Sequence, residues 1–243
     1  MELTQVNAAF RKVLQDFTVL LRVKLPENLK VVMLYGSAVG GDYSKKHSDI
    51  NILLIVEQLD TATLKSIGIL KRRRGFGAIA PLVLSKKDME TSVDTFPIEF
   101  LDIKENHILI WGEDYSKDLV INLTHLRHQC EVELKSKLIQ AQQAYSAACT
   151  DKRALENFLV KNLPAFIIVF KNILRLKGIS EDAKDKILER IALEFGLSAA
   201  LFRQLWQLRQ ETVKRAEAGD IFERFLEALW QLSDKVDAFM VKG

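Results

Sequence analysis

The stretch VVMLYGSAVGGDYSKKHSDINILLIV, residues 31–56, decides the fold of this chain. It has a near-continuous apolar run at each end, and such runs are typical of strands that are buried on both faces. Gly36 and Ser37 close the first run, and Asp49 stands directly before the second, with eleven residues between Ser37 and Asp49. We therefore expect a strand, a tight turn, a short helix and a second strand.

The flanking sequence continues the mixture of strands and helices up to residue 115. Short apolar runs bounded by turn residues predict further strands at residues 78–84, 98–103 and 107–111. The last two of these strands are expected to form a hairpin. Helical periodicity predicts helices at residues 3–25, 60–74 and 86–93. The N-terminal part is therefore expected to be a mixed sheet with flanking helices.

The strand patterns cease after residue 115, and the remaining chain has the period of helices. Asp151 is suited to cap one helix and Gly178 to end it. Helices are predicted at residues 119–148, 151–176, 180–195, 198–218 and 220–241. The predicted fold class is α+β, with an α/β domain over residues 1–115 and a helical bundle over residues 116–243.

The composition is that of a folded soluble protein, with 48% hydrophobic and 28% charged residues. The net charge of +3 permits an anionic substrate but is too small to indicate a nucleic-acid partner. The two cysteines, Cys130 and Cys149, lack metal-ligand spacing and are typical of reduced thiols in a cytoplasmic protein. The N-terminal segment is amphipathic and interrupted by charge, so we expect neither a signal peptide nor a membrane partner.

A run of four cations, Lys71 to Arg74, ends the helix predicted at residues 60–74. Positive charge suits the C-terminal end of a helix dipole, so a solvated helix end is the favoured interpretation. Contact with an anionic substrate or with RNA is the alternative.

The residues around the first two strands are suited to hold a nucleotide with a metal ion. Gly36 permits close approach of the backbone to a phosphate, and Ser37 can cap the short helix or donate its hydroxyl to a phosphate oxygen. Asp49 and Asn51 are two positions apart on a strand, so their side chains share a face. Glu99 would converge with Asp49 if its predicted strand lay beside the second strand.

The turn at Gly36 and Ser37, the strand start from Asp49 to Asn51 and the later strand with Glu99 resemble the nucleotidyltransferase superfamily. This superfamily includes DNA polymerase beta, the aminoglycoside nucleotidyltransferases and the minimal nucleotidyltransferases. The resemblance implies a nucleotidyltransferase-type mixed sheet, followed by a helical domain. It also implies that Gly36, Ser37 and Asn51 bind a nucleoside triphosphate, and that Asp49, Asn51 and Glu99 hold Mg²⁺, with Asp49 and Glu99 catalytic. One or two ions are expected, and paired ions lie roughly 3.5–4 Å apart.

Asn51 departs from the superfamily pattern, which has a second carboxylate at this position. An amide oxygen can bind Mg²⁺ but brings no charge, so the metal that activates the nucleophile would be held more weakly. Three interpretations remain open: a transferase that uses a single metal or a substrate already prone to attack, a protein that binds a nucleotide without turnover, and a site completed by Asp42 or Asp102. Asp102 would face away from Glu99 if residues 98–103 formed a regular strand.

The leading hypothesis is an enzyme that transfers a nucleoside monophosphate from a nucleoside triphosphate to an unknown acceptor, either a small molecule or a protein. The alternative is a catalytically impaired nucleotide-binding or regulatory module, because Asn51 replaces a metal-binding carboxylate. A third hypothesis is a helical interaction protein with a vestigial α/β part. The apolar helices of residues 181–241 are long enough to bury the interface of a homodimer.

Overall fold

A computed structural model describes residues 8–39, 49–210 and 217–239 of the chain. Contacts between Cα atoms divide the chain into two compact units, unit 1 over Met1–Ile121 and unit 2 over Asn122–Gly243. The division predicted from the change of period, after residue 115, lies slightly before this one. Asp42 and the rest of residues 40–48 lie outside the described residues.

Unit 1 contains a four-stranded mixed sheet in the order β3-β2-β1-β4. The strands are β1 (Leu29–Tyr35), β2 (Ile50–Val56), β3 (Ile79–Ser85) and β4 (His107–Gly112). β1 is antiparallel to both β2 and β4, whereas β2 and β3 are parallel. As a result β1 ends where β2, β3 and β4 begin. We call this edge of the sheet the Gly36 end, because Gly36 directly follows β1 there.

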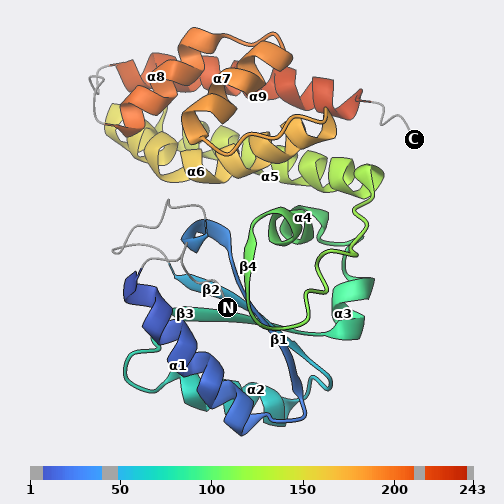
Figure 1. The fold of residues 1–243 in the computed structure, drawn as a ribbon. Helices are drawn as coiled ribbons and strands as arrows, with labels where there is room; N and C mark the ends of the chain where they lie inside the picture. Colours follow the sequence, from blue (N-terminus) through green and yellow to red (C-terminus); the bar gives the residue numbers. More distant parts are fainter. Residues whose placement is uncertain (1–7, 40–48, 211–216, 240–243) are drawn as a thin grey trace. The chain divides into compact units, whose positions relative to one another are not determined.

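One face of the sheet is covered by α1 (Ala8–Lys24) and α2 (Thr61–Lys71), which lie below the sheet in Figure 1. Alternate residues of β1 and β2 point to this face and form a core with both helices. The side chains of this core include Leu14, Phe17, Val32, Leu34, Ile50, Ile52, Leu54, Ile67, Leu70 and Phe76. Asp60 caps α2 by accepting a hydrogen bond from the Thr63 amide at 2.7 Å.

The opposite face of the sheet is covered by α3 (Lys86–Thr91) and α4 (Pro97–Glu105), which Figure 1 shows on the other side from α1 and α2. The other set of alternate strand residues forms this second core with Met89, Phe100, Ile103 and Leu119. Those strand residues are Val31, Met33, Leu53 and Ile55. The two strands are therefore buried on both faces, as their continuous apolar runs predict.

The hairpin expected at residues 98–111 is wrong, because its first half is the helix α4. Pro97 occupies the first turn of this helix, where its fixed φ and missing N–H are tolerated. Its partner β4 pairs with β1 instead. β1 already pairs with β2 on one side and with β4 on the other, and β2 lies between β1 and β3. No position therefore remains beside β1 or β2 for a strand at residues 98–103.

A buried polar network holds the start of β4 to the segment that follows this strand. The His107 ring contacts the Ile103 carbonyl oxygen through Nδ1 at 2.8 Å and Asp114 Oδ2 through Nε2 at 3.1 Å. The fully buried Ser116 donates its hydroxyl to Asp114 Oδ1 at 2.6 Å. Burial by itself would raise the pKa of Asp114, but hydrogen bonds from Ser116 and the charge and hydrogen bond of His107 outweigh it and lower the pKa. Ser116 is buried, and its hydroxyl contacts Nε2 of His107, the same ring nitrogen that contacts Asp114. The network is therefore structural and not a nucleophile with its base.

The described residues of unit 2 form five helices, and the other four pack around α6. They are α5 (Leu123–Ala148), α6 (Lys152–Leu176), α7 (Lys184–Glu194), α8 (Ala199–Arg209) and α9 (Ala218–Asp237). Edge-to-face aromatic contacts join Phe166 to Phe225 and Phe170 to Phe202, with ring centroids 5.0 and 5.8 Å apart. α6 has the length and composition of a membrane span, but half of its apolar window is buried inside this unit. The predicted α+β class, a mixed sheet with flanking helices followed by a helical bundle, is confirmed.

The last residue of β4, Gly112, lies against the backbone of β1, so a substitution there tests the packing of these two strands. It has φ +94, and a Cβ atom added to it would lie 2.0 Å from the Lys30 carbonyl oxygen. We expect Gly112→Ala to destabilise the protein by at least about 2 kcal/mol, because neither the φ value nor the clash can be relieved locally. Urea unfolding measured by circular dichroism is the test. Gly68→Ala in α2 is the control, since a Cβ there meets nothing within 4 Å and alanine should stabilise the helix by about 0.5–1 kcal/mol. Equal stability of the two variants would contradict this account.

The polar network at Asp114 predicts a dependence of stability on acid. The folded pKa of Asp114 is lowered, so its contribution is present above the unfolded pKa and is lost as pH falls through the folded value. We expect Asp114→Asn to lower the free energy of unfolding by about 1–3 kcal/mol near pH 7 and to flatten its fall below about pH 5. The exposed neighbour Asp118→Asn is the control, and unfolding midpoints across pH 3–7 are the measurement. A variant whose acid profile matched that of the control would disprove the assignment.

Candidate nucleotide site at the end of the sheet

The turn after β1 is a short 3-10 helix, Gly36–Ala38, which includes Ser37. Gly36 adopts φ +74, and a Cβ atom added to it would lie 3.1 Å from Asn51 Nδ2. The Val39 amide closes the turn by donating to the Gly36 carbonyl oxygen at 3.0 Å. A glycine is therefore needed here both for its backbone conformation and for its close approach to the neighbouring strand.

Asn51 lies beside this turn because β1 and β2 are adjacent and antiparallel. Leu34 pairs with Ile52 in that register, which brings the end of β1 to the start of β2. Asn51 is half-buried, and by alternation its side chain shares a face with Leu53, on the side of the sheet that α4 covers. Asp49 is exposed and directly precedes β2. The structure thus gathers Gly36, Asp49 and Asn51 at one end of the sheet.

The prediction that Glu99 lies on a strand beside β2 is wrong. It is exposed in the first turn of α4. The strand that pairs with β2 on that side is β3, and Ala80 is the partner of Asn51 in the parallel register. No aspartate or glutamate occurs between Ile79 and Ser85. The strand beside Asn51 therefore offers no carboxylate that could take the place expected for Glu99.

Asp102 is the acid of α4 whose charge affects Tyr35. Burial raises the pKa of the Tyr35 hydroxyl, and the negative charge of Asp102 raises it further. Tyr35 is the last residue of β1 and directly precedes Gly36. The Asn106 side chain donates to Asp102 Oδ1 at 3.3 Å, across one turn at the end of α4. Asp102 would face away from Glu99 only if residues 98–103 formed a strand, and Pro97 is the signal in the sequence for a helix.

The acidic groups at this end of the sheet limit the metal ions that it can hold. Among residues 8–39, 49–210 and 217–239, no group of three or more His, Cys, Asp or Glu side chains is arranged to bind a metal. Asp49 supplies one carboxylate and Asn51 one amide oxygen. That donor set does not fit two Mg²⁺ ions, but it fits one ion whose remaining ligands are phosphate oxygens and water, since Mg²⁺ commonly binds through one or two protein groups plus substrate phosphates.

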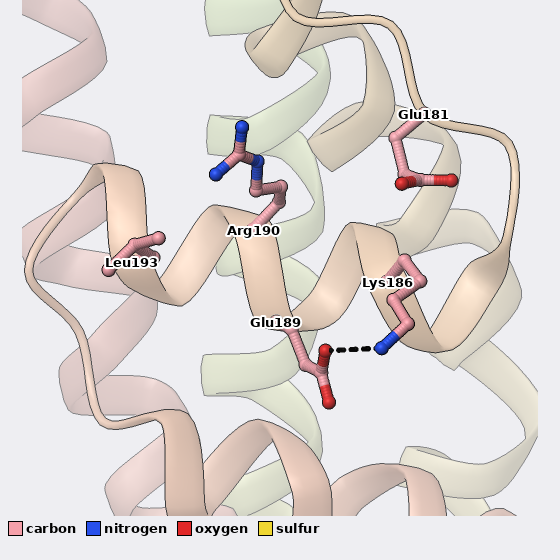
Figure 2. A pocket seen from close by; sticks show the side chains of 5 residues that line it. All are labelled: Glu181, Lys186, Glu189, Arg190 and Leu193. Atoms are coloured by element: carbon pink, nitrogen blue, oxygen red, sulfur yellow. Dashed lines mark hydrogen bonds and ion pairs between the residues drawn. The ribbon is translucent and has the colours of Figure 1, made fainter.

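A hollow of about 380 Å³ lies elsewhere, on the surface of unit 2 (Figure 2). Its lining comes from α7 and the segment before it: Glu181, Lys186, Glu189, Arg190 and Leu193. Figure 2 shows Lys186 and Glu189 joined by an ion pair of 3.0 Å. Two acids and two cations give the lining no preference for phosphate, and it shares no residue with the Gly36 end. We therefore do not assign the nucleotide to this hollow.

Comparisons with known proteins bear on the fold of the chain. No protein-family profile matches the chain, and no curated protein matches it in sequence. Among solved structures, the chain is similar to the crystal structure of spectinomycin adenyltransferase AAD(9) from Enterococcus faecialis with ATP and spectinomycin. The identity is 13%, the TM-score is 0.56, and the match covers 93% of this chain and 99% of the other.

An identity of 13% establishes similarity of fold and nothing finer. The match nevertheless extends over nearly all of both chains, so it includes the mixed sheet of unit 1 and the helices of unit 2. The resemblance that the Gly36–Asn51 stretch indicates is thereby confirmed as a resemblance of fold. This chain has the nucleotidyltransferase fold, with an α+β unit followed by a helical unit.

Proposed function

We propose that the protein binds a nucleoside triphosphate at the Gly36 end of its sheet and transfers the nucleoside monophosphate to an acceptor, with release of pyrophosphate. The observation that carries the proposal is the turn at Gly36, whose backbone lies against Asn51 with Asp49 at the same end. A glycine with positive φ leaves the backbone open to a phosphate. The similar fold of an adenyltransferase whose structure contains ATP supports the same assignment.

The turn and the start of β2 have separate roles in the proposal. The backbone of the turn at Gly36 contacts the phosphates, while the side chain of Ser37, which the sequence predicts to join them, lies outside the described part of the structure. Asp49, with the amide oxygen of Asn51, would hold one Mg²⁺ that accompanies the nucleotide. When bound, that ion would neutralise part of the phosphate charge, and transfer of a phosphoryl-type group depends mainly on such positioning and neutralisation.

Asp102 is proposed as the group that accepts the proton of the acceptor. Asp102 is proposed here instead of Glu99, for which the sequence predicts metal binding and catalysis, because the charge of Asp102 raises the pKa of Tyr35, the residue before the turn. A carboxylate is a suitable base for a hydroxyl that becomes acidic as it attacks. The acceptor remains a proposal in its broadest form, a small molecule or a protein side chain with a nucleophilic oxygen or nitrogen.

A second candidate function is nucleotide binding without turnover. Two observations favour it: Asn51 stands where the superfamily has a carboxylate, and β3 contributes no acid next to it. Under this candidate the protein holds a nucleotide as a sensor or regulator. The two functions differ in one measurable respect, since only the transferase releases pyrophosphate.

Substitutions at Asp49 and Asn51 separate these functions. We expect Asp49→Ala to weaken ATP binding in Mg²⁺ and to lower transfer at least about 100-fold, because it removes the one carboxylate at the start of β2. Asn51→Asp should raise transfer, since it adds a charged ligand for the metal. Calorimetry with ATP and Mg²⁺, and pyrophosphate release with spectinomycin as a probe acceptor, are the measurements. Asn51→Leu is the control that removes the amide oxygen without adding charge.

The results assign the function as follows. Unchanged ATP binding and transfer in Asp49→Ala would reject the site. ATP binding that depends on Asp49, with pyrophosphate release appearing only in Asn51→Asp, would establish the second candidate instead of the first.

Two of the acids of α4, Asp102 and Glu99, give a further test. We expect Asp102→Asn to lower transfer by about 10²–10⁴-fold with little change in ATP affinity, and to lower the pKa of Tyr35 because a neighbouring negative charge is lost. Glu99→Gln is the matched control, three residues earlier and exposed, and should leave both quantities nearly unchanged. Ultraviolet titration of tyrosine and pyrophosphate release are the readouts. A larger loss of transfer in Glu99→Gln than in Asp102→Asn would restore Glu99 as the acid of the site.

A further inference from the structure

The segment from Thr61 to Lys87 has an unusual charge for this chain. It contains seven cations and neither aspartate nor glutamate, although the whole chain carries a net charge of only +3. The rest of the chain is therefore net acidic. Four of the seven cations are consecutive, Lys71 to Arg74, and we call these four residues the basic turn.

Backbone hydrogen bonds before and after the basic turn, and the buried Phe76 that follows it, fix its backbone. The Arg73 amide donates to the Leu70 carbonyl oxygen at 3.0 Å, and the Phe76 amide donates to the Arg73 carbonyl oxygen at 3.2 Å. Phe76 is buried and makes an edge-to-face contact with Phe17 of α1, with ring centroids 5.1 Å apart. The side chains of Arg72, Arg73 and Arg74 are exposed. The backbone is thus fixed while three guanidinium groups face solvent, which lowers the entropic cost of binding a ligand.

The topology of the sheet places the basic turn at the Gly36 end. α2 runs back from the far end of β2, and the turn joins it to β3, which is parallel to β2. The Ile50 amide donates to the Ala78 carbonyl oxygen at 2.7 Å, so the residues after the turn lie beside the start of β2. Phe76 belongs to the core of the α1 and α2 face, whereas Asn51 is on the α4 face. The cations therefore lie at the same end as the nucleotide site but on the other face of the sheet.

The helix dipole explains only part of this run of cations. The dipole favours positive charge within the last turn of a helix, where Lys71 lies, and its effect falls off beyond that turn. Arg73 and Arg74 follow the C-cap residue Arg72. Within the part of the chain that the structure describes, no ion pair joins a carboxylate to any of the four cations. Their charge is therefore available to an anionic ligand.

We propose that the basic turn binds the sugar–phosphate backbone of a single-stranded nucleic acid. Arginine presents a planar fork of donors that matches phosphate oxygens, and consecutive cations match the regular spacing of phosphates along a strand. A flexible single strand can adapt its backbone to a short run of exposed cations. The aromatic residue of the turn, Phe76, is buried, so binding depends on phosphates and not on stacked bases. This binding does not depend on the proposed transfer of nucleotides.

Fluorescence anisotropy with a labelled 20-nucleotide oligodeoxythymidine tests the proposal. The triple variant Arg72→Gln, Arg73→Gln, Arg74→Gln removes three exposed charges. The control variant Lys12→Gln, Lys30→Gln, Lys186→Gln removes the same number, each from an ion pair with a carboxylate. We expect the first variant to weaken binding at least about tenfold and to reduce the slope of log affinity against log salt by about 2, because each phosphate contact contributes about 0.7. The control should bind within about twofold of the unaltered protein.

Several outcomes would overturn the proposal. These are a lack of binding to the oligonucleotide at low salt, an equal loss in both variants, and a loss of ATP affinity in the first variant while oligonucleotide binding persists. The last result would assign the basic turn to the nucleotide instead. Vesicles containing anionic lipid provide a further comparison, and binding to them in place of the oligonucleotide would point to a membrane surface. Circular dichroism confirms folding, and the single variants Arg73→Gln and Arg74→Gln repeat the test if the triple variant unfolds.

Discussion

The contact between the backbone of Gly36 and the side chain of Asn51 is the constraint around which the candidate site is organised. It exists because β1 and β2 are antiparallel neighbours, so the chain leaves one strand where it enters the other. A residue with a Cβ at position 36 would be strained by its φ of +74 and would crowd Asn51 Nδ2. The same register brings Asp49 to this end, and the parallel pairing of β2 with β3 brings the basic turn. A turn at a glycine with positive φ, a carboxylate and a run of cations thus share one end of a sheet that packs apolar side chains on both faces.

The balance of charge at this end has a consequence for how a nucleotide would bind. A site with three carboxylates repels a triphosphate strongly, and metal ions must offset that repulsion before the ligand can approach. Here the start of β2 carries one carboxylate and one neutral amide, and β3 carries neither aspartate nor glutamate. Under the proposed function, the site would therefore need fewer metal ions for binding and would gain less metal-dependent stabilisation of a transition state. Asn51 would consequently affect catalysis more than it affects binding.

The segment at residues 97–105 shows why part of the site could not be predicted from local pattern. Its apolar residues are too few to distinguish a short helix from a strand by period alone. The outcome depends on distant partners, since β4 takes the free edge of β1 and leaves no position for another strand there. As a helix, the segment packs Phe100 and Ile103 onto the sheet and leaves Glu99 exposed. Asp102 then becomes the acid whose charge reaches Tyr35.

The sequence by itself determined the α+β class, the two central strands, the turn at Gly36 with Asp49 and Asn51 near it, and the helical second half. These features are local: continuous apolar runs, a glycine at a turn and the helical period are each contained within one segment. Only the tertiary structure decided that the segment with Glu99 is a helix, with the charge of Asp102 raising the pKa of Tyr35, and that the basic turn shares an end of the sheet with Gly36. Those relations depend on the order and direction of strands that are far apart in the chain, and on which faces of the sheet remain to be covered.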